Sequence, residues 1–328
     1  MCTALTLQTA QGNTFFGRTM DFSYVLEPEI YVIPKGYSWN NLLNTHTIRN
    51  HYSVMGIGQD IHPVTLADGV NEMGFAAAAL YFPSYAAYDA VVPQDTSHIS
   101  IAALELVNFL LGQCSCVAQA ASLLRVIRIV GVTDPVTDSV APLHWIIADQ
   151  SGKAMTIEKT ADGLGIMENN VGVLSNSPDF KWHMTNLRNY MNVLPWQNSE
   201  ADWGTISLTP FGQGAGTMGL PGDYTPPSRF VRTAWLKSHT PLPSETDAAI
   251  NTCFHLLDSV TIPKGTVITQ RGDPDFTQYT AFMDLSDQRY FFKTYDNCAI
   301  ATVELPRRNG TQIRSLGKLN RPITFESL

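Results

Sequence analysis

The N-terminal segment constrains the fold most, because it predicts a β-hairpin that starts almost at the first residue. Residues 3–9 form a run in which β-branched and apolar side chains alternate, as is typical of a strand. Residues 14–19 resume a strand pattern. The sequence Gln11-Gly12-Asn13 between them is typical of a tight turn. We therefore expect the first residues of the chain to lie inside a β-sheet.

The length of the turn determines which residues face each other across the hairpin. A four-residue loop at residues 10–13 would place Cys2 opposite Asp21, with both side chains on one face of the sheet. Arg18 lies three residues before Asp21, so in a regular strand it would point to the other face. For Arg18 to reach Cys2 as well, a bulge or a strand end is needed, and Gly17 permits a bulge.

Segments with strand and helix patterns follow in groups along the rest of the chain. Strands are predicted at residues 52–56, 64–67, 75–81, 144–148, 154–158, 172–174, 279–282, 289–294 and 299–305. Apolar spacing predicts helices at residues 101–114, 117–124, 180–191, 228–235 and 246–257, the fourth with Ser228 as its N-cap. This order favours antiparallel sheets between helical layers over βαβ units, in one domain spanning residues 1–328.

One long stretch, residues 195–227, is rich in Gly and Pro and matches neither pattern. It contains Trp196, Trp203 and Phe211, which are uncommon in flexible linkers. We expect an ordered loop packed on the body of the protein.

Charge and composition argue against several classes of function. The chain has 21 Lys and Arg residues against 29 Asp and Glu residues, a net charge of −8, which disfavours contacts with nucleic-acid phosphates. No apolar run reaches the roughly 18 residues of a membrane span. No basic residue precedes Arg18, as a secretion signal would require, and five cysteines are too few for a disulfide framework. A cytoplasmic protein without nucleic-acid or membrane partners is expected.

Cys2 has the clearest catalytic potential. Removal of Met1 is expected because the side chain after it is small, and removal would give Cys2 a free α-amino group. Such an amine has a pKa of about 7.7 to 8.0, so it can accept the thiol proton and later protonate a leaving amine. A guanidinium such as that of Arg18 would favour the thiolate, and the Asp21 carboxylate could hold the amine.

Two motifs suggest a metal or a nucleotide, but their context disagrees. In Cys114-Ser115-Cys116 the thiols do not share a helix face, and no second pair of cysteines or histidines completes a zinc site. The sequence Gly214-Ala215-Gly216-Thr217-Met218-Gly219 matches a dinucleotide fingerprint, but prolines follow where its helix should begin. We therefore expect no metal and no cofactor.

Several motifs, spread in order over nearly the whole chain, resemble one protein family. They are Met1-Cys2-Thr3, Arg18-Thr19-Met20-Asp21, Ala79-Leu80-Tyr81-Phe82-Pro83, Leu174-Ser175-Asn176-Ser177-Pro178, and the segment from Phe211-Gly212-Gln213-Gly214 through Leu220-Pro221-Gly222-Asp223 to Arg229-Phe230. Together they resemble the choloylglycine hydrolases, which are N-terminal-nucleophile amide hydrolases and include conjugated bile salt hydrolases and penicillin V acylases.

The resemblance implies an α+β fold, a four-layer αββα sandwich of two antiparallel sheets, and hydrolysis of a linear amide C–N bond in a small N-acyl substrate. Cys2 matches the family's nucleophile, and Arg18 and Asp21 match the residues around it. Asn176 matches the residue that helps bind the tetrahedral oxyanion, a contact worth about 2.7 to 4 kcal/mol, and Arg229 matches a second arginine of the site. A homotetramer is also implied, with residues 195–227 as the exchanged contact.

The substrate prediction depends on position 81. Bile salt hydrolases typically carry Asn there, whereas this chain has Tyr81, which resembles the penicillin V acylase branch. An aromatic ring in the pocket would suit an aryloxyacetyl group and take space from a steroid. Penicillin V is therefore the first prediction; conjugated bile salts and N-acyl-homoserine lactones are the alternatives. In a different class, the chain would be a catalytically silent binding protein that retains Met1.

Overall fold

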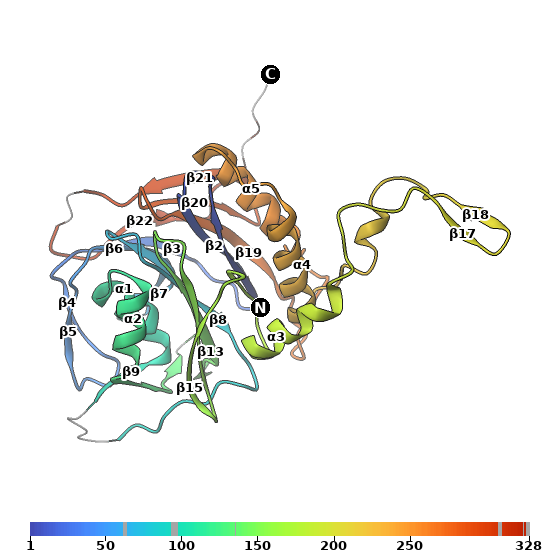
Figure 1. Ribbon diagram of the computed structural model, residues 1–328. Coiled ribbons are helices and arrows are strands. Elements are labelled where there is room, and N and C mark those ends of the chain that lie inside the picture. The colour runs from blue at the N-terminus through green and yellow to red at the C-terminus, as the bar shows by residue number, and fades with distance from the viewer. Residues whose placement is uncertain (62–63, 93–97, 135, 308–309, 324, 326–328) are drawn as a thin grey trace.

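Two antiparallel sheets stack face to face in the computed structural model, which describes residues 1–61, 64–92, 98–134, 136–307, 310–323 and 325 (Figure 1). The six-stranded sheet has the order β16 (Val173–Leu174), β1 (Cys2–Gln8), β2 (Thr14–Phe22), β19 (Phe276–Asp284), β20 (Arg289–Thr294) and β21 (Asn297–Glu304). The eight-stranded sheet has the order β15 (Gly163–Glu168), β14 (Ala154–Thr160), β13 (Leu143–Ala148), β8 (Ala76–Tyr81), β7 (Val64–Asn71), β6 (Val54–Asp60), β3 (Glu29–Ile33) and β22 (Arg314–Lys318).

Helices cover the outer face of each sheet. The six-stranded sheet packs against α4 (Pro226–His239) and α5 (Thr246–Asp258), and the eight-stranded sheet packs against α1 (Leu106–Gln113) and α2 (Val117–Leu124). The predicted four-layer αββα sandwich is therefore confirmed. The smaller elements are β4 (Ser38–Asn40), β5 (Thr47–Arg49), β9 (Ile99–Ala102), η1 (Ala103–Glu105), β10 (Ile127–Val130), β11 (Thr133–Asp134), β12 (Ser139–Val140), α3 (Phe180–Asn186), η2 (Leu187–Tyr190), β17 (Ala201–Trp203), β18 (Ile206–Leu208) and η3 (Ala215–Thr217).

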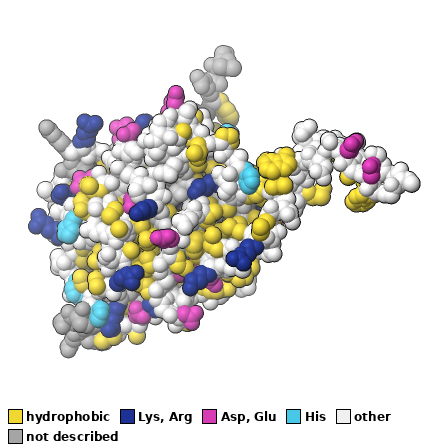
Figure 2. All heavy atoms as spheres, viewed as in Figure 1, with side chains coloured by type: hydrophobic (Ala, Val, Ile, Leu, Met, Phe, Trp, Pro, Cys, Tyr) yellow, Lys and Arg dark blue, Asp and Glu magenta, His cyan; other side chains and the backbone are white. Residues whose placement is uncertain are grey.

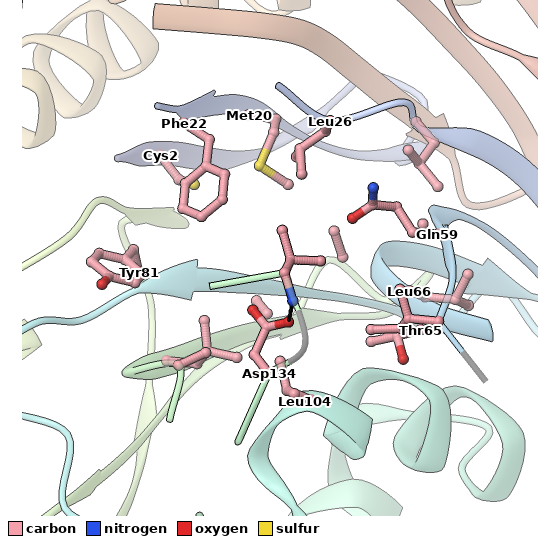
Figure 3. Close-up of a pocket in the computed structure, with 18 of the residues that line it drawn as sticks. Cys2, Met20, Phe22, Leu26, Gln59, Thr65, Leu66, Tyr81, Leu104 and Asp134 are labelled. Carbon is pink, nitrogen blue, oxygen red and sulfur yellow. Dashed lines mark hydrogen bonds between the residues drawn. The ribbon is translucent and has the colours of Figure 1, made fainter. Parts of the chain in front are cut away.

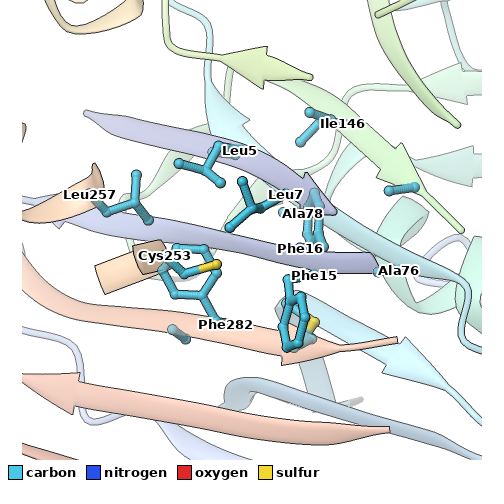
Figure 4. Packing of buried hydrophobic residues seen from close by; sticks show 14 of the residues in the cluster. Leu5, Leu7, Phe15, Phe16, Ala76, Ala78, Ile146, Cys253, Leu257 and Phe282 are labelled. Carbon is cyan, nitrogen blue, oxygen red and sulfur yellow. The ribbon is translucent and has the colours of Figure 1, made fainter. Parts of the chain in front are cut away.

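The alternation of side chains along the strands divides the core into layers (Figure 4). Leu5 and Phe15 leave the six-stranded sheet on its outer face, where the cluster continues to Leu257 of α5. Ala76 and Ala78 of β8 lie between the two sheets and are fully buried. Because residues two apart share a face, one strand serves both the helical layer and the space between the sheets. That division decides which residues can meet Cys2.

The predicted hairpin forms, but its register differs by one residue from the prediction. Gln8 pairs with Thr14, so the loop spans residues 9–13, and Cys2 lies opposite Met20 rather than Asp21. The longer loop closes with a hydrogen bond from Thr9 N to Asn13 O (2.9 Å). A shift of one residue exchanges the two faces of a strand. Arg18 therefore shares the inner face with Cys2, and no bulge is needed to bring it there.

The observed register also determines the surroundings of Asp21 and Gly17. Asp21 pairs with Met1 through two backbone hydrogen bonds and faces the helical side of the sheet. Gly17 stands in a regular stretch of β2, and a Cβ there would collide with the Phe282 ring and Ala281 O. The glycine is thus required for the close approach of β19, and not for the bulge that the sequence suggested.

Two helix boundaries also differ from the prediction. Ile101 belongs to β9, and α1 begins only at Leu106. The N-cap of α4 is Thr225 rather than Ser228, because two prolines occupy the first helical positions, where no backbone N–H is needed. Ser228 lies in the first turn and donates a hydrogen bond to Asp223 Oδ2 (2.6 Å).

Most of the stretch at residues 195–227 does not pack on the body as predicted, although its last residues contact or join α4. It projects from the two sheets as an arm that carries the β17–β18 hairpin (Figure 1). Trp196, Trp203 and Phe211 are largely exposed, and hydrophobic side chains mark the arm in the space-filling view (Figure 2). In the described part of the chain, no helix is long and apolar enough to cross a membrane.

Candidate active site

Cys2 is the first residue of β1, the strand that lies between β16 and β2 in the six-stranded sheet. Its side chain is buried and points into the space between the two sheets. Nη2 of Arg18 contacts its Sγ. The structure thus brings Cys2 and Arg18 together through an ordinary antiparallel register.

A buried carboxylate that the sequence analysis missed lies beside Arg18. Asp68 of β7 is 3.8 Å from Arg18 Nη1, and both side chains are fully buried. Tyr279 and Tyr290 each donate a hydrogen bond to Asp68, at 2.7 and 2.9 Å. Burial raises the pKa of Asp68, and Arg18 and the two tyrosines oppose that rise. No local motif marks Asp68, because its partners come from three other strands.

Arg18 is held by main-chain oxygens as well as by Asp68. Nη1 donates to Ala79 O (2.9 Å) and Nε donates to Thr19 O (3.0 Å). Burial by itself would lower the pKa of Arg18, but the thiol of Cys2, Tyr279 and Asp68 outweigh burial and raise it. The guanidinium is therefore a fixed positive charge beside the sulfur, as a stabiliser of a thiolate must be.

On the helical face of the same sheet, Asp21 and Arg229 form a second buried pair. Arg229 Nη1 of α4 lies 3.7 Å from Asp21 Oδ2, and neither side chain is exposed. Asp21 also accepts hydrogen bonds from Thr277 Oγ1 (2.5 Å) and Thr19 Oγ1 (3.1 Å). Burial raises the pKa of Asp21, which Arg229 opposes. Arg229 in turn donates to Cys2 O (2.6 Å), so this pair holds the main chain of the cysteine.

Asn176 joins the two faces of the site. Its Oδ1 accepts hydrogen bonds from Cys2 N (2.7 Å) and from Arg229 Nη2 (2.7 Å). Its Nδ2 donates one hydrogen to the main-chain oxygen of Tyr81 (2.6 Å). A side-chain amide carries two N–H donors, so the second is available for a negative oxygen near Cys2. The five residues of the predicted site therefore converge on the first residue of β1.

A pocket opens beside Cys2 between the two sheets (Figure 3). Its walls are mostly apolar and come from strands far apart in sequence, and include Met20, Phe22, Leu26, Ile57, Leu66 and Leu143. Cys2 and Tyr81 lie toward one end, and Gln59 and Thr65 lie toward the other. Asp134 is the acidic group in the wall, and its carboxylate accepts a hydrogen bond from Val136 N (2.9 Å).

Besides Cys2 and Arg18, sequence reasoning identified only Tyr81 in this wall. The ring of Tyr81 is half-buried and meets Phe22 edge to face, with centroids 6.2 Å apart. The other wall residues carry no motif, because apolar strand residues look alike whether they line a pocket or a core. No group of three or more metal-ligating side chains occurs among the described residues.

His183 of α3 lies behind Asn176 and was also missed. Its Nε2 donates to Asn176 O (2.8 Å), and its ring stacks on Phe230 with centroids 4.6 Å apart. The side chain is fully buried. Burial lowers the pKa of His183 to about 4, although the hydrogen bond to Asn176 opposes this. The ring is therefore neutral around neutral pH.

Comparisons with known proteins identify the family and the fold. The model of the family described as linear amide C–N hydrolases, choloylglycine hydrolase family, matches residues 2–313. A bile salt hydrolase/transferase of Clostridium perfringens is 35% identical over 331 residues, which cover 99% of each chain. The solved C2A mutant of the conjugated bile acid hydrolase from Clostridium perfringens superimposes with a TM-score of 0.91, at 33% identity and 100% coverage of both chains. Penicillin V acylase from Agrobacterium tumefaciens shares the fold, with a TM-score of 0.76 at 20% identity over 96% of this chain and 91% of its own.

The low pKa of His183 predicts acid lability. In the unfolded chain a histidine binds its proton below about pH 6.5, whereas His183 in the folded protein binds one only below about 4. Stability is therefore lost as the pH falls from 6.5 to 4, by on the order of 3 kcal/mol from this group. Urea unfolding at several pH values measures the free energy of unfolding. This free energy should fall less steeply between pH 6.5 and 4 in His183→Gln than in the wild type. The exposed His239→Gln variant is the control and should keep the wild-type slope; equal slopes in all three proteins would contradict the assignment.

Proposed function

The chain belongs to the choloylglycine hydrolase family of linear amide C–N hydrolases, and we propose that it cleaves conjugated bile salts with Cys2 as an N-terminal nucleophile. The contact of Cys2 Sγ with the buried Arg18 guanidinium, at the wall of an apolar pocket, is the observation that carries the proposal. Such a pocket suits an apolar acyl group. An acyl group bound there would have its carbonyl carbon next to the Cys2 sulfur.

The ranking of candidate substrates proposed here differs from the one that the sequence analysis based on Tyr81. That residue favoured penicillin V, with bile salts as the alternative, but the relatives support the alternative better. The bile salt hydrolase/transferase of Clostridium perfringens matches nearly the full length, whereas the penicillin V acylase, at 20% identity, supports the fold alone. One tyrosine in a wall formed by many strands does not decide the shape of the whole pocket.

The first chemical step requires a free amine on Cys2, which we propose arises by removal of Met1. The amine accepts the thiol proton, and the sulfur attacks the amide carbonyl carbon to give a tetrahedral intermediate with a negative oxygen. In the structure Cys2 N donates to Asn176 Oδ1 at 2.7 Å, a contact that would orient the amine. Arg18 stabilises the thiolate before attack.

The intermediate then collapses to a thioester. Asn176 Nδ2 donates its second hydrogen to the negative oxygen, and the Cys2 ammonium protonates the departing amine. Water, deprotonated by the same amine, attacks the thioester and releases the free acid together with the regenerated thiol. Asp21 and Arg229 hold the Cys2 main chain throughout, and neither exchanges a proton in this scheme.

Penicillin V remains the second candidate, because Tyr81 lies at the Cys2 end of the pocket. The ring contacts Phe22 edge to face, is half-buried and lines the pocket. A phenoxy group could pack on that ring, whereas the four rings of a steroid would need the far end as well. N-acyl-homoserine lactones fit the same chemistry and belong in the same substrate panel.

Replacing the nucleophile should abolish turnover without unfolding the protein. We expect Cys2→Ala to lower amine release from taurocholate more than about 10³-fold, with an unchanged melting temperature. Intact mass of the wild type should be short by one Met. The exposed Cys298→Ala variant is the matched control and should keep full activity. Activity in Cys2→Ala would exclude the mechanism, and a retained Met1 without turnover would favour a silent binding protein.

The substrate order can be tested at position 81. The wild type should show a higher kcat/KM for taurocholate and glycocholate than for penicillin V. Tyr81→Asn should lower kcat/KM for penicillin V by up to about 10-fold, because one aromatic contact is lost, and should spare the bile salts. Tyr85→Asn is the control, since Tyr85 does not line the pocket described here. A wild type that prefers penicillin V would reverse the order proposed.

We also propose that residues 1–328 form one domain, that four copies assemble, and that the arm at residues 195–227 supplies the contact. Exposed apolar side chains gather on the arm, which supports burial against another copy. The free thiol of Cys2 suits a reducing compartment, which supports a cytoplasmic location.

Light scattering tests the assembly directly. The wild type should have about four times the 36.1 kDa mass of one chain. The double variant Trp203→Ser with Ile206→Ser should shift the mass toward one chain, because both side chains are largely exposed on the arm. Val25→Ser, exposed on another part of the surface, should leave the mass unchanged. A wild type at 36.1 kDa would remove the assembly proposal.

A further inference from the structure

Two buried histidines hold successive carbonyl groups of the loop that carries Asn176. His144 Nε2 lies 2.8 Å from Ser175 O, and His183 Nε2 lies 2.8 Å from Asn176 O. Both side chains have no exposed surface. The two histidines come from different layers, since His144 belongs to β13 of the eight-stranded sheet and His183 belongs to α3.

The hydrogen bonds place a hydrogen on Nε2 of each ring. A carbonyl oxygen only accepts, so Nε2 must carry the hydrogen in both histidines. Nδ1 of His183 has no partner in the described part of the chain, which fits a neutral ring with its only hydrogen on Nε2. The pKa of His183, lowered to about 4 by burial, keeps it in that form near neutral pH.

Aromatic stacking and a carboxylate fix the ring orientations. His183 stacks on Phe230 at an interplanar angle of 15°, and His144 stacks on Phe82 at 7°. His144 Nδ1 lies 3.2 Å from Glu158 Oε1, and the same oxygen accepts a hydrogen bond from Phe180 N (2.9 Å). Each donor therefore points at its carbonyl from a ring that has little freedom to turn.

We propose that His144 and His183 are positioning residues, which fix the Asn176 amide by clamping the carbonyl groups of Ser175 and Asn176. The inference rests on the proposed function, in which Asn176 Nδ2 stabilises the negative oxygen. An oxyanion donor works only if it is fixed before the charge develops, because reorientation during the reaction costs part of its benefit. The side chain of Asn176 is already anchored at Oδ1 and by one hydrogen of Nδ2. The clamp fixes the main chain from which that side chain extends.

The test separates the donor from the bulk of the ring. His183→Phe removes the Nε2 donor but keeps a flat ring against Phe230, and it also removes the unpartnered Nδ1. His183→Gln restores an amide donor at a similar reach. The matched control is His239→Phe, because His239 also contacts a carbonyl, Trp235 O (2.8 Å), and stacks on Trp235, but it is exposed on α4. The variants His144→Phe and His144→Gln provide a second, independent test.

Steady-state kinetics on taurocholate, glycocholate and penicillin V give the main measurement. We expect His183→Phe to lower kcat about 100-fold with KM unchanged, because a displaced transition-state donor affects kcat alone. His183→Gln should recover most of that loss, and His239→Phe should match the wild type. The rate at which iodoacetamide labels Cys2, measured by mass spectrometry, should be equal in all variants. Wild-type kcat in His183→Phe and His144→Phe, or a loss that appears in KM alone, would overturn the proposal.

Hydrogen exchange separates failure of the clamp from failure of the proposed function. Peptides covering residues 173–178 should exchange faster in His183→Phe than in the wild type and the His239→Phe control. This measurement needs no substrate. If the wild type hydrolyses none of the amides, the proposed function fails, and unchanged exchange in His183→Phe would then overturn the clamp as well. If His183→Phe does not fold, the His144→Phe and His144→Gln pair decides by the same two measurements.

Discussion

The hydrogen bonds at Asn176 Oδ1 are the contact on which the rest of the site depends. One oxygen accepts from Cys2 N and from Arg229 Nη2, each at 2.7 Å, so the proposed nucleophile, the proposed oxyanion donor and a buried arginine meet at a single atom. Displacing any of the three would leave a buried donor without its partner, which costs more than the bond itself contributes. This convergence explains why a loop far along the chain, next to β16, must pack beside the first strand. The strand order β16-β1-β2 places that loop beside Cys2 through backbone pairing alone.

The six-stranded sheet separates the chemistry of Cys2 from its support. The side chains of Cys2 and Arg18 lie on the inner face, where Asp68 and the apolar pocket meet them. Asp21 and Arg229 lie on the face covered by α4, where Arg229 contacts the main chain of the cysteine and Asp21 pairs with Arg229. A strand alternates its side chains strictly, so residues 18 and 21 of one strand can serve opposite faces without distortion. The inner face can therefore accommodate substrate while the outer face stays packed.

Local patterns were enough to predict the hairpin, the antiparallel sheets and the helical layers, since each depends on periodicity within a short segment. The register was not predictable to one residue, because it depends on whether Thr9 joins the loop, and a hydrogen bond to Asn13 decides that. Cys2, Arg18 and Asp21 could be argued from the hairpin, Asn176 and Arg229 came from the resemblance, and Asp68 and the two histidines carry no motif. Their partners lie on other strands and helices, as when His144 contacts Ser175, and no spacing along one segment encodes such a contact. The arm was misjudged for a related reason, because its tryptophans indicated burial but could not indicate against what.

The balance of buried charge fits the thiolate that the proposed mechanism requires at Cys2. Arg18 is paired with Asp68, and Arg229 is paired with Asp21, so the fixed charges cancel within each pair. In the proposed mechanism, moving a proton from the Cys2 thiol to the amine freed by loss of Met1 creates one positive and one negative charge on the same residue, and the net charge of the site does not change. Burying an unpaired charge is expensive, whereas separating charge within one residue beside a compensated arginine is not. A neutral His183 behind Asn176 fits this balance, because in the proposed clamp it positions the Asn176 amide without adding a charge that would need its own partner.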